Sequence, residues 1–455
     1  MKTPELIKSL FAFVVLSSLM TLVFADDKAP QQVLIKNVKV FDGTSDKSTA
    51  ITNVLIEDNL IKTISTEAKA SVDATVIDGG GRVLMPGLID SHQHMGFPAP
   101  YPVMMNNVDW MWIGAASASE AKLMLLRGFT TVRDAGGPAI GLARAIDQGR
   151  AEGPRIYPAG PAISQTSGHG DTRNYSQTHP NMSGGQSTFF QNHFAFIADG
   201  PAEVLRATRE SLRRGATHIK VTIGGGASSQ ADPLHTTQYT VEEIRAAVQA
   251  ASDWGSYVMV HGYHDESVRR ALEAGVLGID HGTLMTEKTM KMLAKKGGYL
   301  VPQARLFTVT EKDKAFFESF GPATLGKVMV LNDALDNQMK LAKKYKVKVG
   351  FGTDLFGSSK DYAKQSEEFE FRLKWFTPVE ILKQATSVNA EIVALSGKLN
   401  PYTAGALGVI KPGAYADLLI VDGDPLQDIK LLGDPDNNLK LIMKDGKVYK
   451  NTLRQ

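Results

Sequence analysis

The middle of this 455-residue chain alternates short apolar segments with helix-like segments, and this order limits the folds it can adopt. Eight candidate strands are found, at 84–90, 130–134, 155–159, 218–223, 257–260, 278–280, 299–301 and 347–350. Eight strands alternating with helices over about 300 residues favour an α/β fold of the (β/α)8 TIM-barrel type over a doubly wound sheet. The chain has no Rossmann or P-loop glycine pattern, and Gly224-Gly225-Gly226 is only a weak turn signal.

The segments on either side of this region have a different pattern. Residues 32–86 and 416–448 contain short β-branched runs separated by Gly, Asp and Asn turn signals. Two β-rich ends predict one small β-sandwich domain built from both. We therefore expect a signal peptide at 1–25, the two parts of the β-sandwich at 26–86 and 401–455, and a catalytic barrel at 87–400.

The first 25 residues have the features of a secretory signal peptide. Lys2 and Lys8 precede an apolar run, which ends in the small-x-small sequence Val23-Phe24-Ala25. The run is short for a membrane-spanning helix, although an uncleaved anchor is an alternative. We expect an exported chain, periplasmic or secreted, that begins near Asp26 and has no stable membrane insertion after cleavage.

Composition excludes several classes of function. The chain has no Cys, which rules out disulfides, iron–sulfur clusters, thiolate zinc sites and cysteine nucleophiles. Its 50 basic and 48 acidic residues nearly cancel, so no overall field favours nucleic acid. A metal ion would have to be bound by His, Asp, Glu or a modified side chain.

Residues that can bind metal lie at or near the carboxyl ends of five of the candidate strands. They are His92, His94, Lys220, His261, His281 and Asp354. His92 and His94 are two residues apart on an extended segment, so their side chains point the same way. Each of the others has an ordinary alternative as a core histidine, a snorkelling lysine or a helix cap. Because barrel enzymes place their chemistry at this face, a shared site is favoured over six coincidences.

Lys220 lies within the otherwise apolar segment 218–222. A buried lysine is costly unless it is paired or modified. With a lowered pKa, its amine could react with carbon dioxide to form a carbamate, whose anionic oxygens are metal ligands.

The segment Pro86–His94 (PGLIDSHQH) resembles the metal-binding signature of the amidohydrolase superfamily. The other ligand-type residues follow in the matching order, and the resemblance covers nearly the whole mature chain. It is closest to the imidazolonepropionase-like branch with a carboxylated lysine, which includes Xaa-Pro dipeptidases and ochratoxin-hydrolysing amidases.

The resemblance implies two divalent ions, by default Zn²⁺, bridged by carboxylated Lys220 and by hydroxide. His92, His94 and Asp354 would bind one ion, and His261 and His281 the other. Asp354 would be catalytic, accepting the hydroxide proton and passing it to the departing amine. The resemblance also implies a homo-oligomer.

Substrate-binding residues are less clear from the sequence. His169, His264 and Tyr239 are expected at the same rim, and His264 could bind the scissile carbonyl or the oxyanion. Each has a structural alternative as a loop residue. The segment Met95–Trp112 is rich in large apolar groups, which predicts either an apolar wall over the site or a subunit contact. Arg133-Asp134 is interpreted as supporting the site.

The sequence therefore predicts hydrolysis of a linear amide in a dipeptide or an N-acyl amino acid, with an aryl-acyl amino acid such as ochratoxin A as one member. The alternative enzyme is a cyclic amide or lactone hydrolase on the same metals. A non-catalytic binding protein is disfavoured, because all six ligand-type positions are filled. No nucleic acid partner or organic cofactor is expected.

Overall fold

The computed structural model describes residues 30–99, 103–104, 109–173, 175, 177–179, 182 and 193–453. The predicted signal peptide lies outside these residues. In the part that is described, none of the helices has the length and apolar character needed to cross a membrane.

Each of the eight predicted central strands has a counterpart in the structure, and the strands pair in parallel within two groups. They are β6 (Leu88–Gln93), β7 (Phe129–Asp134), β8 (Arg155–Pro158), β11 (Ile219–Thr222), β12 (Val258–His264), β13 (Gly278–Leu284), β14 (Tyr299–Val301) and β15 (Lys348–Val349). They form the groups β6-β7-β8 and β11-β12-β13-β14-β15, and the second continues through β9 (Ala162–Ser164) and β10 (Ala195–Ile197).

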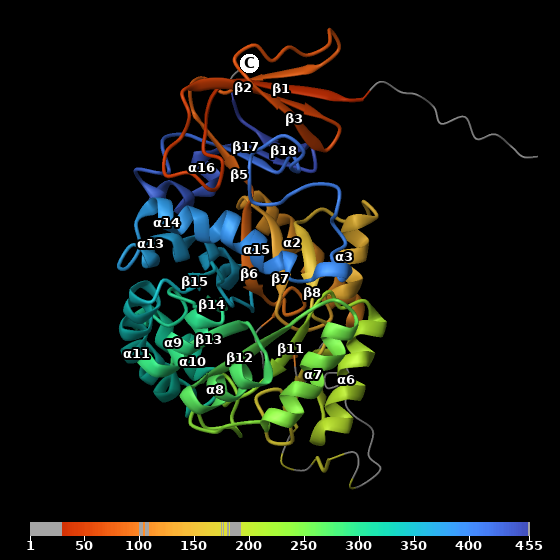
Figure 1. Ribbon diagram of the computed structural model, residues 1–455, viewed down its shortest axis with the longest axis vertical. Helices are drawn as coiled ribbons and strands as arrows, with labels where there is room; N and C mark the ends of the chain where they lie inside the picture. The colour runs from red at the N-terminus through yellow and green to blue at the C-terminus, as the bar shows by residue number, and fades with distance from the viewer. Residues whose placement is uncertain are drawn as a thin grey trace, which may run out of the picture.

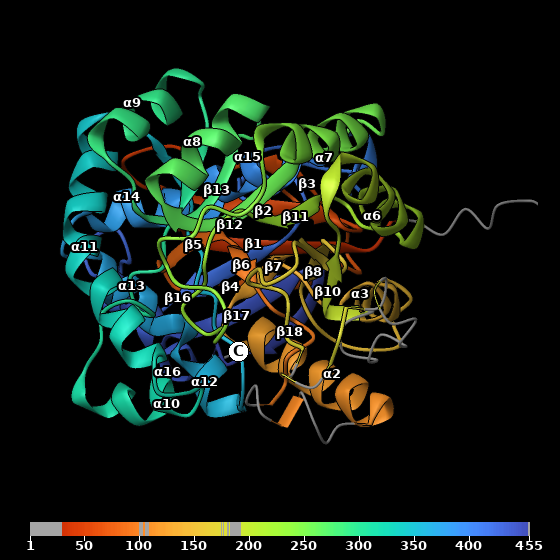
Figure 2. The same ribbon diagram turned by 90° about the horizontal axis from the view of Figure 1, so that it is seen from below.

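Backbone hydrogen bonds link the two groups. The Thr217 amide donates to the Pro158 carbonyl at 2.8 Å, and the Ser91 amide donates to the Phe351 carbonyl at 2.8 Å. Figure 2 shows helices arranged around the central strands. This α/β arrangement of parallel strands is consistent with the predicted TIM-type barrel.

The structure also contains α-helices, several of which begin at a side-chain cap. The longer ones are α2 (Trp110–Leu126), α3 (Ile140–Asp147), α6 (Gly200–Arg214), α7 (Val241–Asp253), α8 (Asp265–Ala274), α9 (Glu287–Lys295) and α11 (Thr324–Lys344). The shorter ones are α10 (Lys314–Glu318), α12 (Ser359–Ala363), α13 (Glu368–Arg372), α14 (Pro378–Lys383), α15 (Asn389–Ala394) and α16 (Pro435–Asn438). Helix α7, for example, starts at a capping box formed by Thr240 and Glu243.

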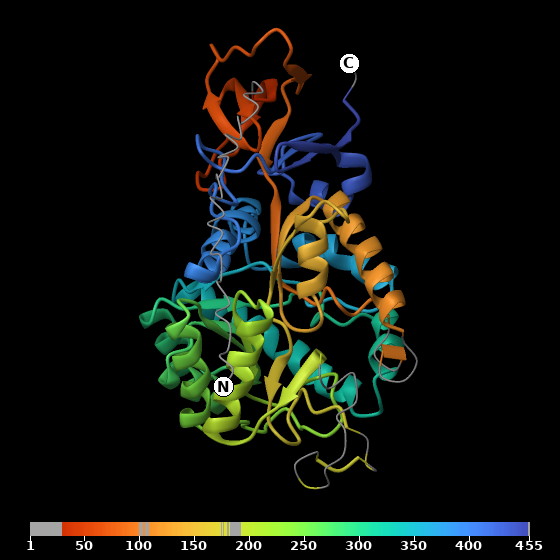
Figure 3. The ribbon, with the colours of Figure 1, turned by 90° about the vertical axis from the view of Figure 1, so that its right-hand side faces the viewer.

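The two chain ends form one eight-stranded sheet. Its strands are β1 (Gln32–Val40), β2 (Ile51–Glu57), β3 (Leu60–Ile64), β4 (Thr75–Asp78), β5 (Val83–Pro86), β16 (Leu418–Val421), β17 (Leu439–Lys444) and β18 (Lys447–Asn451). The order is β18-β17-β16-β5-β1-β2-β3, with β4 beside β1, and the two ends join where β5 pairs antiparallel with β16. This sheet lies at one end of the molecule, with its red and blue parts side by side (Figures 1 and 3). The sandwich form of this domain stays a prediction.

The predicted strand 84–90 is in fact two strands. Gly87 separates β5, in the end sheet, from β6, in the barrel. A Cβ atom at Gly87 would lie 2.2 Å from the hydroxyl oxygen of Thr130, so only glycine fits between the two parts. The prediction joined them because both segments are apolar and fully buried, which gives no break in the hydrophobic pattern.

A buried ion-pair network joins the barrel to the end sheet. Arg155 of β8 pairs with Asp417, and its Nη2 lies 2.6 Å from Asp445 Oδ1. Asp417 also accepts the backbone amide of Asp445 at 2.8 Å. Arg155 and Asp417 are buried, so the Asp417 carboxylate depends on Arg155 for its ion pair.

We expect the Arg155→Met variant to be destabilised by about 3–5 kcal/mol, because it leaves the Asp417 carboxylate buried without its cation. The free energy of unfolding, measured by urea titration, checks this. Arg213→Met removes an equally long cation from an exposed pair with Glu210 and should leave the unfolding curve unchanged. Equal stability of the two variants would contradict a supporting role for Arg155.

Candidate active site

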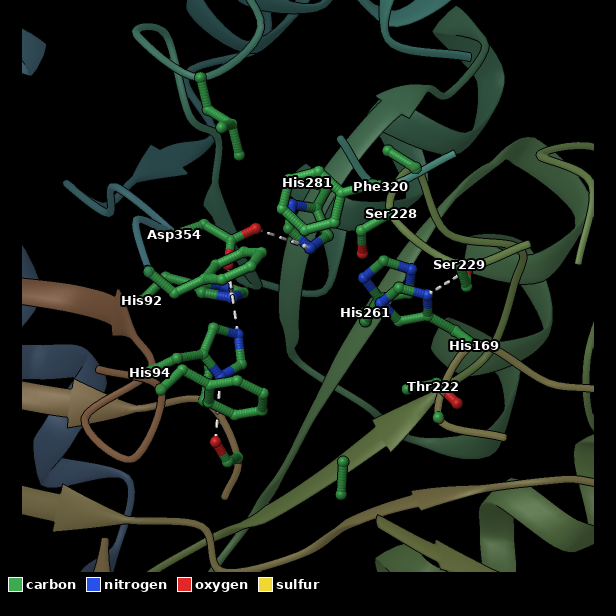
Figure 4. A pocket seen from close by; sticks show the side chains of 18 of the residues that line it. His92, His94, His169, Thr222, Ser228, Ser229, His261, His281, Phe320 and Asp354 are labelled. Carbon is green, nitrogen blue, oxygen red and sulfur yellow. Dashed lines mark hydrogen bonds and ion pairs between the residues drawn. The ribbon is translucent and has the colours of Figure 1, made fainter. Parts of the chain in front are cut away.

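A cavity opens at the carboxyl ends of the barrel strands, and all six predicted ligand residues line it. His92 lies on β6 and His94 directly after it, Lys220 lies on β11, His261 on β12 and His281 on β13, and Asp354 follows β15. Figure 4 shows His92, His94, His281 and Asp354 pointing toward one another. The fold therefore gathers residues that are up to 262 positions apart in the sequence, from His92 to Asp354.

His92, His94 and Asp354 form a compact group. Asp354 Oδ1 lies 3.3 Å from His92 Nε2 and 3.2 Å from His94 Nε2, and the three ligand atoms lie within 4.8 Å of one another. His281 Nε2 lies 3.9 Å from the other carboxylate oxygen, Oδ2. Burial would raise the pKa of Asp354, but the neighbouring His92 and His94 hold it well below its usual value. The carboxylate is therefore ionised, as a metal ligand must be.

A buried carboxylate beneath this group aligns the first and last strands. Asp90 accepts the His92 amide at 3.0 Å, the Thr353 hydroxyl at 2.6 Å and the Gln365 side-chain amide at 2.9 Å. These bonds connect the residue before Asp354 with the segment that carries His92. Asp354 has a φ of 53°, a conformation that costs energy for a residue other than glycine and is common at functional sites.

The imidazoles of His261 and His281 are buried. Burial lowers the pKa of His281 to about 3 and that of His261 well below its usual value. The Nδ1 atom of His281 lies 2.7 Å from Gln303 Oε1, and that of His94 lies 3.0 Å from the Gly136 carbonyl. These contacts hold each ring with Nε2 toward the cavity, the arrangement of metal-binding histidines.

The donor set fits a divalent metal ion. His261 Nε2 is buried and has no hydrogen-bond partner among the described residues, which is costly unless a ligand occupies it. Imidazole nitrogens together with carboxylate oxygens are the ligands that zinc and related ions prefer.

Lys220 lies in a buried charge network that the sequence did not reveal. Its Nζ is 3.0 Å from Asp280 Oδ2, and Arg133 Nη2 is 2.7 Å from Asp280 Oδ1. Asp280 Oδ2 also lies 3.3 Å from His92 Nδ1. Burial lowers the pKa of the Lys220 amine, the direction that carboxylation requires, while Asp280 acts in the opposite sense. Arg133 has the supporting position predicted for it.

Of the three predicted substrate residues, only His169 lines the cavity. Its ring stacks on His261, with ring centroids 4.0 Å apart and planes 8° apart, as Figure 4 shows. Tyr239 is buried elsewhere, and its hydroxyl donates to the Ala198 carbonyl at 2.8 Å. His264 does not line the cavity, although the residue before it, Tyr263, does.

Strand geometry explains why Tyr263 lines the cavity and His264 does not. Residues two apart on β12 share a face, so Tyr263 lies on the same side as the ligand-type residue His261, and His264 does not. The ring centroid of Tyr263 lies 5.1 Å from that of His261 and 4.8 Å from that of His281. Tyr263 is therefore a better candidate than His264 to donate a hydrogen bond to a reacting carbonyl.

We expect Tyr263→Phe to lower turnover by about 100-fold or more, the usual cost of removing one oxyanion donor. The substitution keeps the ring and removes only the hydroxyl. His264→Ala is the matched variant and should keep near-wild-type kinetics. Steady-state kinetics on one amide substrate compare them, and a large loss in His264→Ala with none in Tyr263→Phe would restore His264 to the role predicted from the sequence.

Aromatic side chains cover much of the rest of the cavity. They are Phe97, Phe194, Phe307, Phe316, Phe317, Phe320 and Phe356. Among the described residues of Met95–Trp112, Phe97 alone lines the cavity. On α2, Met111 is 83% exposed and Trp112 is 47% exposed, so they lie on the outer surface. Tyr101 and Met105 lie outside the described residues.

Comparison with known proteins identifies the family. The model of the amidohydrolase family matches residues 83–449, so the chain belongs to the amidohydrolase family. The chain is similar to the ochratoxinase of Aspergillus niger, with 28% identity over 417 residues that cover 87% of this chain and 82% of that protein. The crystal structure of the A. niger ochratoxinase aligns with a TM-score of 0.79 and 26% identity over 93% of this chain and 96% of the other.

Two further crystal structures are similar over the whole fold. A prolidase complexed with N-methylphosphonate-L-proline has a TM-score of 0.85 and 34% identity, over 93% of this chain and 100% of the other. A Xaa-Pro dipeptidase with bound methionine has a TM-score of 0.80 and 30% identity, over 92% and 100%. These relatives confirm the predicted superfamily branch, and the chain is a hydrolytic, amide-cleaving enzyme.

Proposed function

We propose that this enzyme hydrolyses linear amide bonds in dipeptides or N-acyl amino acids, in the manner of a dipeptidase or carboxypeptidase, with two divalent metal ions. The observation that carries the proposal is the convergence of six ligand-type side chains on one cavity. The relatives named as an ochratoxinase, a prolidase and a Xaa-Pro dipeptidase support a linear amide as substrate.

His92, His94 and Asp354 would bind one ion, His261 and His281 the other, and carboxylated Lys220 would bridge them. When bound, the ions supply a hydroxide nucleophile near neutral pH and polarise the scissile carbonyl. Zn²⁺ is the default for these ligands, and Fe, Mn or Co ions suit them as well.

The protein's own side chains supply the proton transfer and the orientation of the substrate. The Asp354 carboxylate accepts a proton and delivers it to the amide nitrogen as the C–N bond breaks, since an unprotonated amine leaves poorly. The Tyr263 hydroxyl donates to the carbonyl oxygen as negative charge develops on it. The phenylalanines exclude water from the reacting atoms.

The aromatic wall indicates a bulky apolar group on the substrate. Besides Lys220, no lysine or arginine lines the cavity within the described part of the chain, while the wall offers broad apolar surface. An aryl-acyl amino acid such as ochratoxin A therefore suits the cavity better than a substrate with a charged side chain.

We expect Phe320→Ala to raise the KM for an aryl-acyl amino acid about tenfold and to change the KM for an acetyl amino acid little, since it removes apolar contact from the large group alone. Phe316→Ala tests a second position of the wall. Equal effects on both substrates would show that Phe320 supports the fold and does not select the acyl group.

The alternative is hydrolysis of a cyclic amide or a lactone. A mass-spectrometric screen of the metal-loaded protein separates the two, with a pool of dipeptides, N-acyl and aryl-acyl amino acids, cyclic amides and lactones, and Asp354→Asn as the blank. Release of free amino acids from the linear amides supports the proposal. Turnover limited to ring opening would overturn it.

The signal peptide predicted at 1–25 leads us to propose that the enzyme is exported to the periplasm or secreted. The family resemblance leads us to propose that it forms a homo-oligomer. N-terminal sequencing of protein from cell fractions tests the first proposal. Light scattering of the purified enzyme tests the second.

A further inference from the structure

A lysine outside the metal site holds one wall of the cavity in place. Lys327 lies in the first turn of α11, and its ammonium donates to three backbone carbonyls of residues 226–232: those of Gly226 at 2.9 Å, Ser229 at 2.7 Å and Asp232 at 3.0 Å. A lysine ammonium has three N–H donors, so every donor is used. Residues 226–232, which follow β11, form the clamped loop.

The clamped loop holds His169. Ser229 Oγ lies 2.8 Å from His169 Nδ1, and Asp232 Oδ2 lies 3.6 Å from the same nitrogen. Asp232 is buried and also accepts the Gly226 amide at 2.7 Å, so its carboxylate is held within the loop. These contacts to Nδ1 orient the ring of His169, which lines the cavity and stacks on the ring of His261.

The contact between loop and ring is close. A Cβ atom at Gly226 would lie 1.7 Å from His169 Nδ1, so a displacement of the loop toward the ring would push the imidazole from its place. Ser228 and Ser229 of the same loop line the cavity. The position of the loop therefore sets both the imidazole and two serines that line the cavity.

A second contact extends the clamp to the aromatic wall. Gln230 Nε2 donates to the Phe320 carbonyl at 2.6 Å and lies 3.3 Å from Thr324 Oγ1. The clamped loop thus joins His169, on one side of the cavity, to the segment that carries Phe316, Phe317 and Phe320, on the other. Lys327 anchors this connection from α11.

We propose that Lys327 is a positioning residue, which acts through the clamped loop to hold His169 against the substrate; this inference rests on the proposed amide hydrolysis. Lys327 itself is not among the residues that line the cavity. Its loss therefore changes the placement of His169 and leaves the metal ligands in position.

The test compares Lys327→Met with Lys340→Met. Lys340 lies on the same helix, but its side chain is 70% exposed and forms a surface ion pair with Asp336 at 2.7 Å. With an aryl-acyl amino acid that the wild type hydrolyses, Lys327→Met should have a kcat roughly 10- to 100-fold lower, the range expected when a catalytic group is displaced. Metal content should be unchanged, and amide hydrogen exchange over residues 226–232 should be faster. Lys340→Met should match the wild type in all three.

A double-mutant cycle shows whether Lys327 acts through His169. In the His169→Ala background, Lys327→Met should change kcat by less than about twofold, because residues that act as one unit are not additive. A full additional loss in that background would overturn the inference, as would wild-type kcat in Lys327→Met alone.

If Lys327→Met does not fold, Ser229→Ala removes only the hydroxyl next to His169 Nδ1, and an unchanged kcat there overturns the inference as well. The proposed function fails if the wild type hydrolyses no linear amide, and this inference then fails with it. If the wild type is active and the Lys327 variants behave differently from the results expected here, only this inference fails.

Discussion

Replacing Lys220 with alanine should remove bound metal and amide hydrolysis together. Lys220 is buried and lines the cavity together with the imidazoles and Asp354. Once carboxylated, this side chain would be the protein ligand that both ions share. We expect turnover to fall by roughly 10³-fold or more, on the scale of losing a main stabiliser of the transition state. Elemental analysis of metal per chain and a hydrolysis assay measure the two losses.

The control for this variant is Lys340→Ala, in which an exposed lysine is removed from α11. It should retain both metal and turnover. Lys220→Glu restores a carboxylate at the end of a shorter chain and should recover part of the metal content. Two ions per chain in Lys220→Ala would contradict the bridging role.

Asp354→Asn should keep the fold and lose most of the turnover. Asparagine has nearly the same shape as aspartate, but it can neither accept the proton nor pass it to the amine. General acid–base groups contribute about 10²- to 10⁴-fold, so we expect a loss in that range. Circular dichroism checks the fold, and single-turnover kinetics check the chemical step.

Asp333→Asn is the matched control, since Asp333 is exposed on α11, away from the cavity. It should have wild-type kinetics. Turnover near the wild-type value in Asp354→Asn would contradict the assignment of Asp354 as the group that carries the proton.

The order of the barrel strands, and the convergence of the six ligand-type side chains on one cavity, could be predicted from the sequence because both follow local rules. The i, i+2 spacing of His92 and His94 sets a shared direction, and strand ends set a shared face. The same rule, applied to residues 261–264, favours Tyr263, which lines the cavity, over His264, which does not.

Other features depend on contacts between distant parts of the chain. Asp280 precedes His281 in an apolar strand, and only the structure reveals that its carboxylate lies between Lys220 and Arg133. Most of the aromatic wall likewise comes from residues 307–320 and Phe356, far from the segment that was predicted to form it. The hydrophobic pattern of the sequence does not identify such residues, because their function depends on contacts between distant parts of the chain.

The measurement that tests the central claim most directly is a titration of the metal-stripped enzyme with Zn²⁺ in the presence of bicarbonate. Bound metal and hydrolysis of an aryl-acyl amino acid are recorded at each step. We predict that turnover rises with metal content and reaches its limit at two ions per chain, as expected for a binuclear site. Full turnover in the metal-free enzyme, or a limit at one ion per chain, would contradict the account.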